Sequence, residues 1–431
     1  MDAVRSEADP DSTATDDDTD RSVVFVSQQF PPDRSGHASR IRDMSTALAD
    51  DGWTVTVLAP PPSFPPSAFD HSWRPVESTT TDGVVINRLW SPQPTSSDPG
   101  FLTRMAYYVV FAAHAFCWLL LNGRRYDVVV TTTPPISTGV AGLTSLLFGQ
   151  RWVVDVRDLW IDASVSLGFI EQGGALERVS RRYQWFVLHR ADSIAVTTTT
   201  LGEEVCEQYG DSLSAKIELV PNGVDIDRFD ESATADAASD ESRTDDESII
   251  IYTGNIGHAQ DLDVCIDALT RLPEDATLRL VGGGDALPAL QEQAAKQGLT
   301  DRVEFVGPVD HEEIPPLLAD ADVGIAPLKD DSGLSYAMPT KVYEYLGCRL
   351  PVVATGNGEL ERFMTESEGG VHAENDPESI AEAIETLLSH DDLRTERAQT
   401  GYEHVARQYD RAEIAARFSD HLDGLVADGA A

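Results

Sequence analysis

A lysine and a glutamate three residues apart open a predicted helix in the segment MPTKVYEYLG (338–347). Pro339 suits the first turn of a helix, and Thr340 follows it directly. Residues three apart lie on one face of a helix, so Lys341 and Glu344 point to the same side. A lysine there can neutralise a phosphate, and a carboxylate there can accept hydrogen bonds from sugar hydroxyls. An exposed ion pair that stabilises the helix by ~0.2–0.5 kcal/mol explains the spacing equally well.

Glycines gather at four predicted strand ends in the second half of the chain. They lie in YTGNIGH (252–258), VGGGD (281–285), FVGP (305–308) and TGNGE (355–359). Glycine lets the backbone approach a ligand, and free amides at a helix start favour a phosphate. Each loop alone is unspecific, because strand-to-helix turns also use glycine for steric reasons. Four such loops in one domain favour a nucleotide pocket.

Charged residues follow a predicted buried strand in the first half of the chain, in VVDVRDLW (153–160). We expect the charged side chains and Trp160 to face a cleft. Two carboxylates, Asp155 and Asp158, around Arg157 can orient a substrate hydroxyl. A cluster of ions that satisfies itself is an equally good interpretation.

Nothing in the sequence predicts a metal or a disulfide framework. The four cysteines are far apart, without a CxxC or His/Cys cluster. An Asp-Ala-Asp at 320–322 resembles a metal-binding motif of another fold, but it lies before a strand, at the wrong end of the sheet. We therefore expect neither a metal ion nor a cofactor.

Two series of strands alternating with helices must position these groups. The first has predicted strands at 23–27, 54–60, 84–89, 127–133, 152–157, 193–198 and 217–221, and the second at 249–254, 277–282, 303–307, 323–328, 351–355 and 369–373. Continuous apolar strands alternating with helices are typical of parallel sheets covered on both faces. The fold class is therefore α/β, with two Rossmann-like domains and ligands at the carboxyl ends of the strands.

Composition suggests where the domains begin and end. We predict a disordered acidic tail (1–20), a first domain (21–228), an acidic linker (229–248), a second domain (249–408) and a C-terminal helix (409–431).

The chain is strongly acidic, with a formal net charge of -41 and only four lysines. Dispersed acids of this kind are typical of salt-loving archaea, although an acidic partner-binding face in a mesophilic protein is the alternative. The charge argues against a nucleic-acid partner. The N-terminal segment is acidic and lacks an apolar run, so we expect a cytoplasmic protein.

The segment YYVVFAAHAFCWLLL (107–121) is apolar around its whole circumference. Its fifteen residues fall short of the ~20 that span a bilayer, and the strands on either side should join one sheet. Nearby arginines lie at 104, 124, 125 and 151. We expect peripheral membrane contact through 101–121, with a buried core helix as the alternative.

Several of these segments together resemble glycosyltransferase family 4. They are QQFPPDRSGHASR, DVRDLW, NIGHAQDLD and PTKVYEYLGCRLPVVATGNGE, and the resemblance covers about residues 22 to 410. It is closest to the branch that acts on lipopolysaccharide and lipid-linked sugars. The resemblance implies a GT-B fold, a nucleotide-diphosphate sugar donor, often N-acetylated, and retention of configuration. It also implies a polyprenyl- or dolichyl-phosphate-linked or glycan acceptor.

The resemblance assigns roles to individual residues. Glu344 matches the second glutamate of the E-x7-E motif, which holds the nucleotide ribose, and Lys341 would contact the pyrophosphate. Gly36 would approach the diphosphate from the first domain. The candidate donor-binding residues are Gly36, Gly254, Asn255, His258, Gly283, Thr340, Lys341 and Glu344, and the candidate catalytic residues are Lys341, Asp158 and Arg157. His37 is a weaker candidate for donor contact.

Two positions depart from the family pattern. Tyr336 stands where the first glutamate of E-x7-E is expected, which puts the holding of the sugar hydroxyls in doubt. His258 stands where a basic residue is often found, and it either binds phosphate when protonated or caps a helix.

We interpret the chain as a retaining glycosyltransferase at the inner face of the cell membrane. In such enzymes the departing phosphate can take the acceptor's proton, so stabilising the leaving group is the protein's main task. A sugar-nucleotide 2-epimerase and a catalytically inactive nucleotide-sugar-binding partner are the alternatives.

Overall fold

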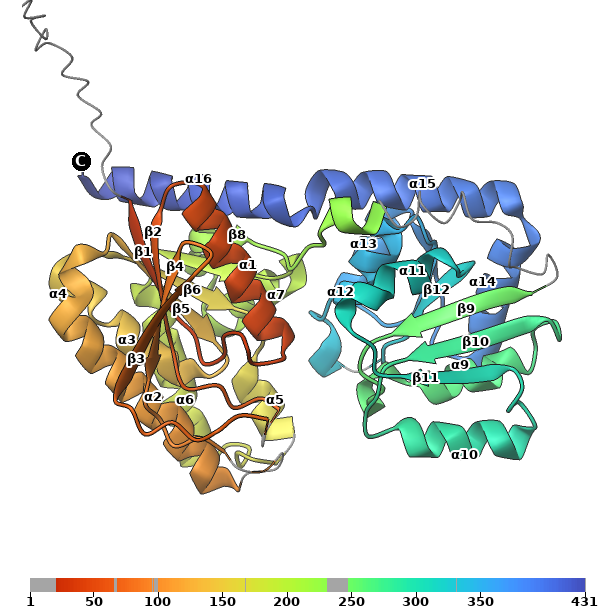
Figure 1. Ribbon diagram of the computed structural model, residues 1–431, viewed down its shortest axis with the longest axis horizontal. Helices are drawn as coiled ribbons and strands as arrows, with labels where there is room; N and C mark the ends of the chain where they lie inside the picture. Colours follow the sequence, from red (N-terminus) through yellow and green to blue (C-terminus); the bar gives the residue numbers. More distant parts are fainter. Residues whose placement is uncertain are drawn as a thin grey trace, which may run out of the picture.

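A computed structural model describes residues 21–65, 68–94, 96, 100–166, 168–230, 247–330 and 332–430. These residues form two α/β domains, and the two last helices run along both of them (Figure 1). The predicted acidic tail (1–20) lies outside the described residues, as does most of the predicted linker (229–248).

The first domain is built on an eight-stranded sheet, ordered β3-β4-β2-β1-β5-β6-β7-β8. Its strands are β1 (Ser22–Val26), β2 (Thr54–Ala59), β3 (Val76–Thr81), β4 (Val84–Leu89), β5 (Val128–Thr133), β6 (Arg151–Val156), β7 (Ser193–Val196) and β8 (Ile217–Leu219). All neighbours are parallel except β3, which is antiparallel to β4. The sequence analysis missed β3 because its sequence, VESTTT, is polar and lies exposed at the sheet edge.

Two helix layers cover the faces of this sheet. Within β1, Val23 and Phe25 pack toward α1 (Gly36–Asp50) and α16 (Arg411–Ala430), whereas Val24 and Val26 pack toward α2 (Phe101–Asn122). The remaining helices of this domain are α3 (Gly139–Gly142), α4 (Ser145–Phe148), α5 (Trp160–Ser166), α6 (Ala175–Arg190) and α7 (Thr199–Tyr209), with short 3-10 turns η1 (Gly123–Arg125), η2 (Ile136–Thr138) and η3 (Asp211–Lys216). The strands are therefore buried on both faces, as their apolar runs predict.

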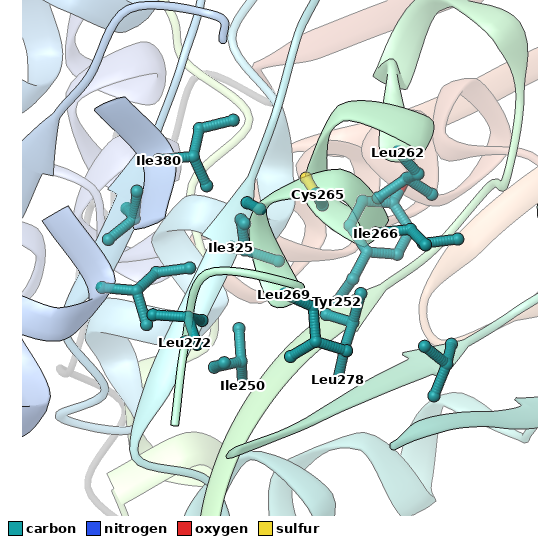
Figure 2. Close-up of a cluster of buried hydrophobic side chains, with 14 of the residues drawn as sticks. Ile250, Tyr252, Leu262, Cys265, Ile266, Leu269, Leu272, Leu278, Ile325 and Ile380 are labelled. Carbon is teal, nitrogen blue, oxygen red and sulfur yellow. The ribbon is translucent and has the colours of Figure 1, made fainter. Parts of the chain in front are cut away.

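The second domain has six parallel strands, ordered β11-β10-β9-β12-β13-β14. They are β9 (Ser248–Thr253), β10 (Ala276–Val281), β11 (Val303–Gly307), β12 (Val323–Ala326), β13 (Val352–Ala354) and β14 (Gly370–His372). The helices are α9 (Leu262–Leu269), α10 (Leu287–Gln297), α11 (Ile314–Ala319), α12 (Thr340–Gly347), α13 (Glu359–Ser367), α14 (Pro377–Ser389) and α15 (Asp391–Gln408), with turns η4 (His258–Gln260), η5 (His311–Glu313) and η6 (Ser332–Leu334). Figure 2 shows the core between one face of this sheet and its helices.

The chain passes between the domains twice, and the two crossings touch. The backbone amide of Val224 donates to the carbonyl of Tyr409 at 2.8 Å, and the amide of Arg411 donates back to the carbonyl of Val224 at 3.0 Å. Beyond this point α16 packs on the first domain, where Trp53 donates its indole N–H to Ser419 at 2.9 Å. The last helix therefore completes the first domain (Figure 1).

Candidate functional site

A cavity of about 1010 Å³ lies between the two domains. One wall comes from the first domain, chiefly the start of α1 and the loop after β6, and the other from the second domain, including the start of α12. Six of the predicted site residues line it, namely Gly36, Arg157, Asp158, Thr340, Glu344 and the weaker candidate His37. The cavity lies where the carboxyl ends of the strands are expected to bind ligands.

Helix α12 presents its two charged residues separately. Val342 and Leu346 are fully buried and fix the helix against the sheet, while Pro339 is the N-cap, directly before the first turn. The ammonium of Lys341 lies 3.7 Å from the centre of the Tyr252 ring, and burial lowers the pKa of Lys341 to about 7.

Glu344 has a different partner. Its Oε1 lies 3.1 Å from Nε2 of His311, and its side chain is 13% exposed. The salt bridge between Lys341 and Glu344, considered above as the alternative, is not formed in the described part of the chain. Glu344 lines the cavity, so its carboxylate can meet a ligand there.

The first glycine loop adjoins Lys341. A Cβ atom on Gly254 would lie 3.5 Å from the Lys341 ammonium, and Gly254, Asn255 and His258 are all exposed. Lys341 thus connects this loop to Thr340 and Glu344 in the cavity wall. The residues that line the cavity do not include Gly254, Asn255, His258, Gly283 or Lys341.

Several glycines in these loops are required by packing alone. A Cβ atom on Gly282 would lie 1.9 Å from the carbonyl oxygen of Gly254, and one on Gly284 would lie 2.3 Å from that of Ile256. The nearest atom to a Cβ on Gly283 is a carbon of Pro308, at 3.4 Å. Steric turn chemistry therefore explains Gly282 and Gly284 but leaves Gly283 open for contact with a ligand.

His258 does not cap a helix. The turn η4 is capped at Gly257, whose amide donates to the Gln260 side chain at 3.1 Å. The capping alternative for His258 is therefore wrong, and phosphate binding remains its predicted role.

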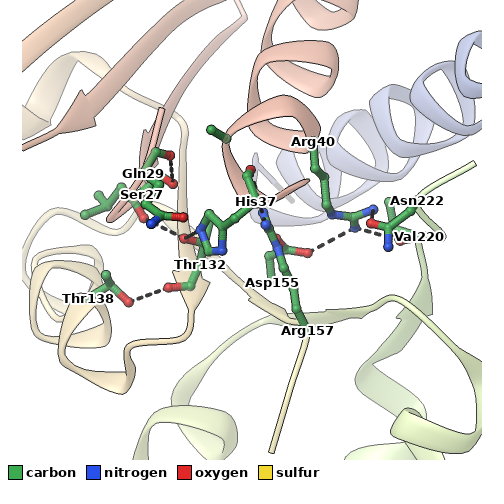
Figure 3. Close-up of polar contacts among 12 residues, drawn as sticks. Ser27, Gln29, His37, Arg40, Thr132, Thr138, Asp155, Arg157, Val220 and Asn222 are labelled. Carbon is green, nitrogen blue, oxygen red and sulfur yellow. Dashed lines mark hydrogen bonds and ion pairs between the residues drawn. The ribbon is translucent and has the colours of Figure 1, made fainter. Parts of the chain in front are cut away.

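Asp155 lies at the centre of a buried ion cluster in the first domain (Figure 3). It accepts hydrogen bonds from Arg40 at 3.1 Å and from Arg157 at 2.7 Å, and its side chain is fully buried. Burial alone would raise the pKa of Asp155, but the two guanidinium groups hold that pKa below its ordinary value. The self-satisfied cluster is the correct interpretation for Asp155, which faces away from the cavity.

The guanidinium of Arg157 has a nitrogen that its protein partners do not use. Besides Asp155, it donates to the carbonyl oxygen of His37 at 3.3 Å. Its Nη2 is buried without a hydrogen-bond partner among the described residues, and Arg157 lines the cavity. The ring of His37 is bound to Thr132 at 3.2 Å, and burial lowers the pKa of His37 well below its ordinary value.

Asp158 is bound from the other domain. Its Oδ1 accepts a hydrogen bond from the Tyr336 hydroxyl at 2.5 Å, and burial raises the pKa of Asp158. Trp160 begins α5 and is half-buried. The tyrosine that departs from the family pattern is thus the partner of a predicted catalytic residue, and no local sequence signal connects positions 158 and 336.

Additional basic residues, which the motifs did not predict, line the cavity. They are Arg34, Arg40, Arg42, Arg228, Arg411 and His311. Arg411 and Arg42 both bind Asp43, at 3.0 and 2.8 Å. Arg34 and Arg40 lie within the quoted segment QQFPPDRSGHASR, which was the available signal, whereas Arg411 arrives only because α16 folds back.

The Asp-Ala-Asp segment lies away from the cavity, as predicted. Asp322 accepts a hydrogen bond from the amide of Ile249 at 2.8 Å, at the start of β9, and Asp320 binds Arg279 at 2.7 Å. Within the described residues, no group of three or more His, Cys, Asp or Glu side chains is arranged to hold a metal ion.

Two parallel-sheet domains facing across a cleft, with a lysine and a carboxylate at the cleft helix, define a GT-B protein. The family model "Glycosyl transferase 4-like domain" matches residues 35–223, and "Glycosyl transferases group 1" matches residues 247–390. Together with the relatives described next, these matches show that the chain belongs to the GT-B glycosyltransferases.

Similar proteins match this chain over nearly its whole length. WcaI of Escherichia coli K12, named as a colanic acid biosynthesis glycosyl transferase, is 24% identical over 93% of this chain and 100% of its own. Sucrose-phosphate synthase from Thermosynechococcus elongatus has a TM-score of 0.75 at 20% identity, covering 95% of this chain and 100% of that chain. HepE of Anabaena, in complex with UDP, has a TM-score of 0.69 at 16% identity, covering 94% and 100%.

Proposed function

We propose that this glycosyltransferase moves a sugar from a nucleotide-diphosphate donor to a lipid-linked glycan, with retention of configuration, at the inner face of the cell membrane. The single observation that carries the donor site is the start of α12, where Thr340 and Glu344 line the cavity and Lys341, between them in sequence, forms no salt bridge with Glu344. The complex of the HepE neighbour with UDP supports a donor of the same class.

Each side of the cavity would hold a different part of the donor. Lys341 would bind the pyrophosphate and Glu344 the ribose diol, with Thr340 beside them. Gly254, Asn255, His258 and Gly283 would complete the donor pocket, and Gly36 would approach the diphosphate from the first domain. A Cβ atom on Gly36 would meet no atom within 4 Å, so the start of α1 leaves room there.

The reaction would depend on charge stabilisation at the leaving phosphate. Burial lowers the pKa of Lys341 to about 7, so binding of an anion would favour its charged form. Nη2 of Arg157, which has no hydrogen-bond partner among the described residues, would be a second donor to the phosphate. Asp158 would accept a hydrogen bond from a substrate hydroxyl. In this scheme the departing phosphate oxygen takes the proton of the attacking acceptor hydroxyl, so no separate protein base is needed.

The membrane face would be the outer helix layer of the first domain. On α2, Phe111, Ala115 and Leu119 are fully buried, whereas Leu102 and Leu121 on the other side are 81% and 86% exposed. Further exposed apolar residues lie on α4 and α6, namely Leu146, Leu147, Leu176, Val179 and Trp185. These helices cover the sheet face opposite α1 and α16 (Figure 1).

The charge of this layer supports an anionic lipid surface as its partner. Residues 101–190 hold nine arginines and six acidic residues, a net charge of +3, whereas the whole chain carries -41. By length and composition α2, at 22 residues, could cross a membrane, unlike the fifteen-residue span expected from sequence. However, β4 and β5 on either side of it join one sheet, so surface docking is the proposal.

A screen of nucleotide sugars in high salt tests the donor. We expect one nucleotide class to raise the melting temperature and to be turned over only when a polyprenyl-phosphate-linked glycan is added, apart from slow hydrolysis. Conversion of the nucleotide sugar to an isomer without acceptor would instead identify an epimerase. Binding without any turnover would identify an inactive partner, and no binding at all would reject the donor site.

Co-sedimentation with vesicles tests the membrane face. The wild type should sediment with phosphatidylglycerol vesicles but not with phosphatidylcholine vesicles. Replacing Leu102 and Leu121 with serine should abolish sedimentation without unfolding, because both lie outside the core. Leu219→Ser, on an exposed leucine of β8, is the matched control and should sediment normally. A wild type that never sediments would exclude surface docking.

A further inference from the structure

Tyr336 reaches from the second domain into the first. It lies just before α12, and its ring packs against the buried cluster of the first domain that contains Leu159 and Leu201. Its carbonyl oxygen accepts a hydrogen bond from the Thr198 hydroxyl at 2.9 Å, and its own hydroxyl donates to Asp158 at 2.5 Å. Tyr336 therefore contacts two successive strand ends of the first domain.

A second set of contacts between the domains lies beside it. Oε2 of Glu359 accepts a hydrogen bond from the amide of Thr200, at the start of α7, at 2.9 Å. Arg362 binds Glu203 at 2.9 Å. Neither contact involves Asp158, so the two sets can be broken independently by substitution.

Asp158 is the one member of these contacts that also lines the cavity with Arg157. Asp162 of α5 is another charged group near Asp158. Its carboxylate binds Arg181 of α6 at 2.6 Å. A phenol that donates to a carboxylate favours the ionised form, so the Tyr336 hydroxyl opposes the effect of burial on Asp158. Because donor and acceptor of this hydrogen bond belong to different domains, separation of the domains must break it.

We infer that Tyr336 is a positioning residue, which holds the Asp158 carboxylate in place for the substrate only while the two domains are closed. The inference rests on the proposed function, since it concerns the same transfer site. It gives position 336 a definite role: the second domain supplies a hydroxyl there, and the carboxylate at the site comes from the first domain. Turnover is thereby tied to domain closure, whereas nucleotide binding to α12 is not.

Tyr336→Phe tests this inference, because it removes the hydroxyl and keeps the ring in its apolar contacts. With the nucleotide sugar identified by the screen, UDP-glucose being the first probe, kcat should fall about tenfold to a hundredfold, and affinity for the donor should change less than twofold. Loss of the hydrogen bond raises the pKa of Asp158. The acid limb of the pH–rate profile should therefore move to higher pH, which a merely structural role would not cause.

Two further variants keep the test decisive. Arg362→Met breaks a neighbouring contact between the domains and should keep the wild-type pH profile. Asp158→Asn should lower kcat, and adding Tyr336→Phe to it should cause no further loss, because the hydroxyl acts through the carboxylate. If Tyr336→Phe keeps the wild-type kcat and pH profile, or if the two losses simply add, the inference is overturned. A wild type inactive on every nucleotide sugar instead rejects the proposed function.

Discussion

The two sides of the cavity differ in how their charged side chains are paired. Behind the first-domain wall, Asp155 is fully buried between Arg40 and Arg157, and Arg40 also donates to the carbonyl oxygens of Val220 and Pro221. On the second-domain side, Lys341 lies over the Tyr252 ring, and it forms no salt bridge within the described residues. Glu344 in the cavity wall contacts the half-exposed His311.

This difference separates charges that hold the structure from charges that can serve a ligand. A buried ion whose partners are all protein groups gains nothing from a ligand, and removing it leaves its partners uncompensated. A buried cation without a partner is held at a cost, which an anionic ligand can offset. The Asp155 cluster should therefore respond to mutation through stability, and the start of α12 through binding.

The largest effect is expected at the first wall. Asp155→Asn leaves Arg40 and Arg157 buried without their carboxylate, and it should lower the free energy of unfolding by about 3–5 kcal/mol. Chemical denaturation at constant high salt measures this loss. Glu77→Gln, which breaks an exposed pair with Arg74, is the control and should change stability by less than about 1 kcal/mol. Equal losses of stability in both variants would contradict the structural role of the buried Asp155 cluster.

The second-largest effect is expected at Glu344, on donor binding. A hydrogen bond to a charged group contributes ~1.5–3 kcal/mol, so Glu344→Gln should weaken donor affinity about tenfold to a hundredfold while the melting temperature stays near that of the wild type. Titration calorimetry with the nucleotide diphosphate measures it. Glu361→Gln, an exposed carboxylate on α13, makes the same change in net charge and should bind normally. Donor affinity within twofold of wild type for Glu344→Gln would place the nucleotide elsewhere.

The features that could be predicted from the sequence are those that a local pattern of residues determines. Apolar runs predicted every strand of both sheets except the polar β3, and the three-residue spacing put Lys341 and Glu344 on one helix, of which Glu344 lines the cavity. What it could not give are partners brought together from far along the chain. Asp155 meets Arg40 across 115 residues, and Asp158 meets Tyr336 across 178. Periodicity carries no information about such pairs, so the self-satisfied carboxylate of Asp155 and the cavity-lining carboxylate of Asp158 could not be told apart.

A smaller effect concerns pH, through Lys341. Burial lowers the pKa of Lys341 to about 7, and a bound diphosphate favours the ammonium and raises that pKa. Affinity for a nucleotide sugar, whose diphosphate does not titrate near neutral pH, should be greatest below pH ~7 and fall by up to tenfold per pH unit above it. Calorimetry in buffers of different ionisation enthalpy should detect uptake of up to one proton near pH ~8. Lys341→Met should abolish that uptake; its persistence would assign the proton to another group.

The smallest effect is expected at Gly283, in the second domain. A methyl group there would meet its nearest neighbour, a carbon of Pro308, at 3.4 Å, which is an ordinary contact, so Gly283→Ala should change stability by less than about 0.5 kcal/mol. If the donor diphosphate lies against this turn, the methyl group should still weaken donor affinity, by about twofold to fivefold. Gly282→Ala is the contrasting variant. Its φ of +136° and the 1.9 Å approach to the Gly254 carbonyl oxygen predict a clear loss of stability whatever binds. Wild-type affinity in a fully stable Gly283→Ala protein would mean that this turn, like its neighbour, serves packing alone, and that only α12 and the first glycine loop hold the donor.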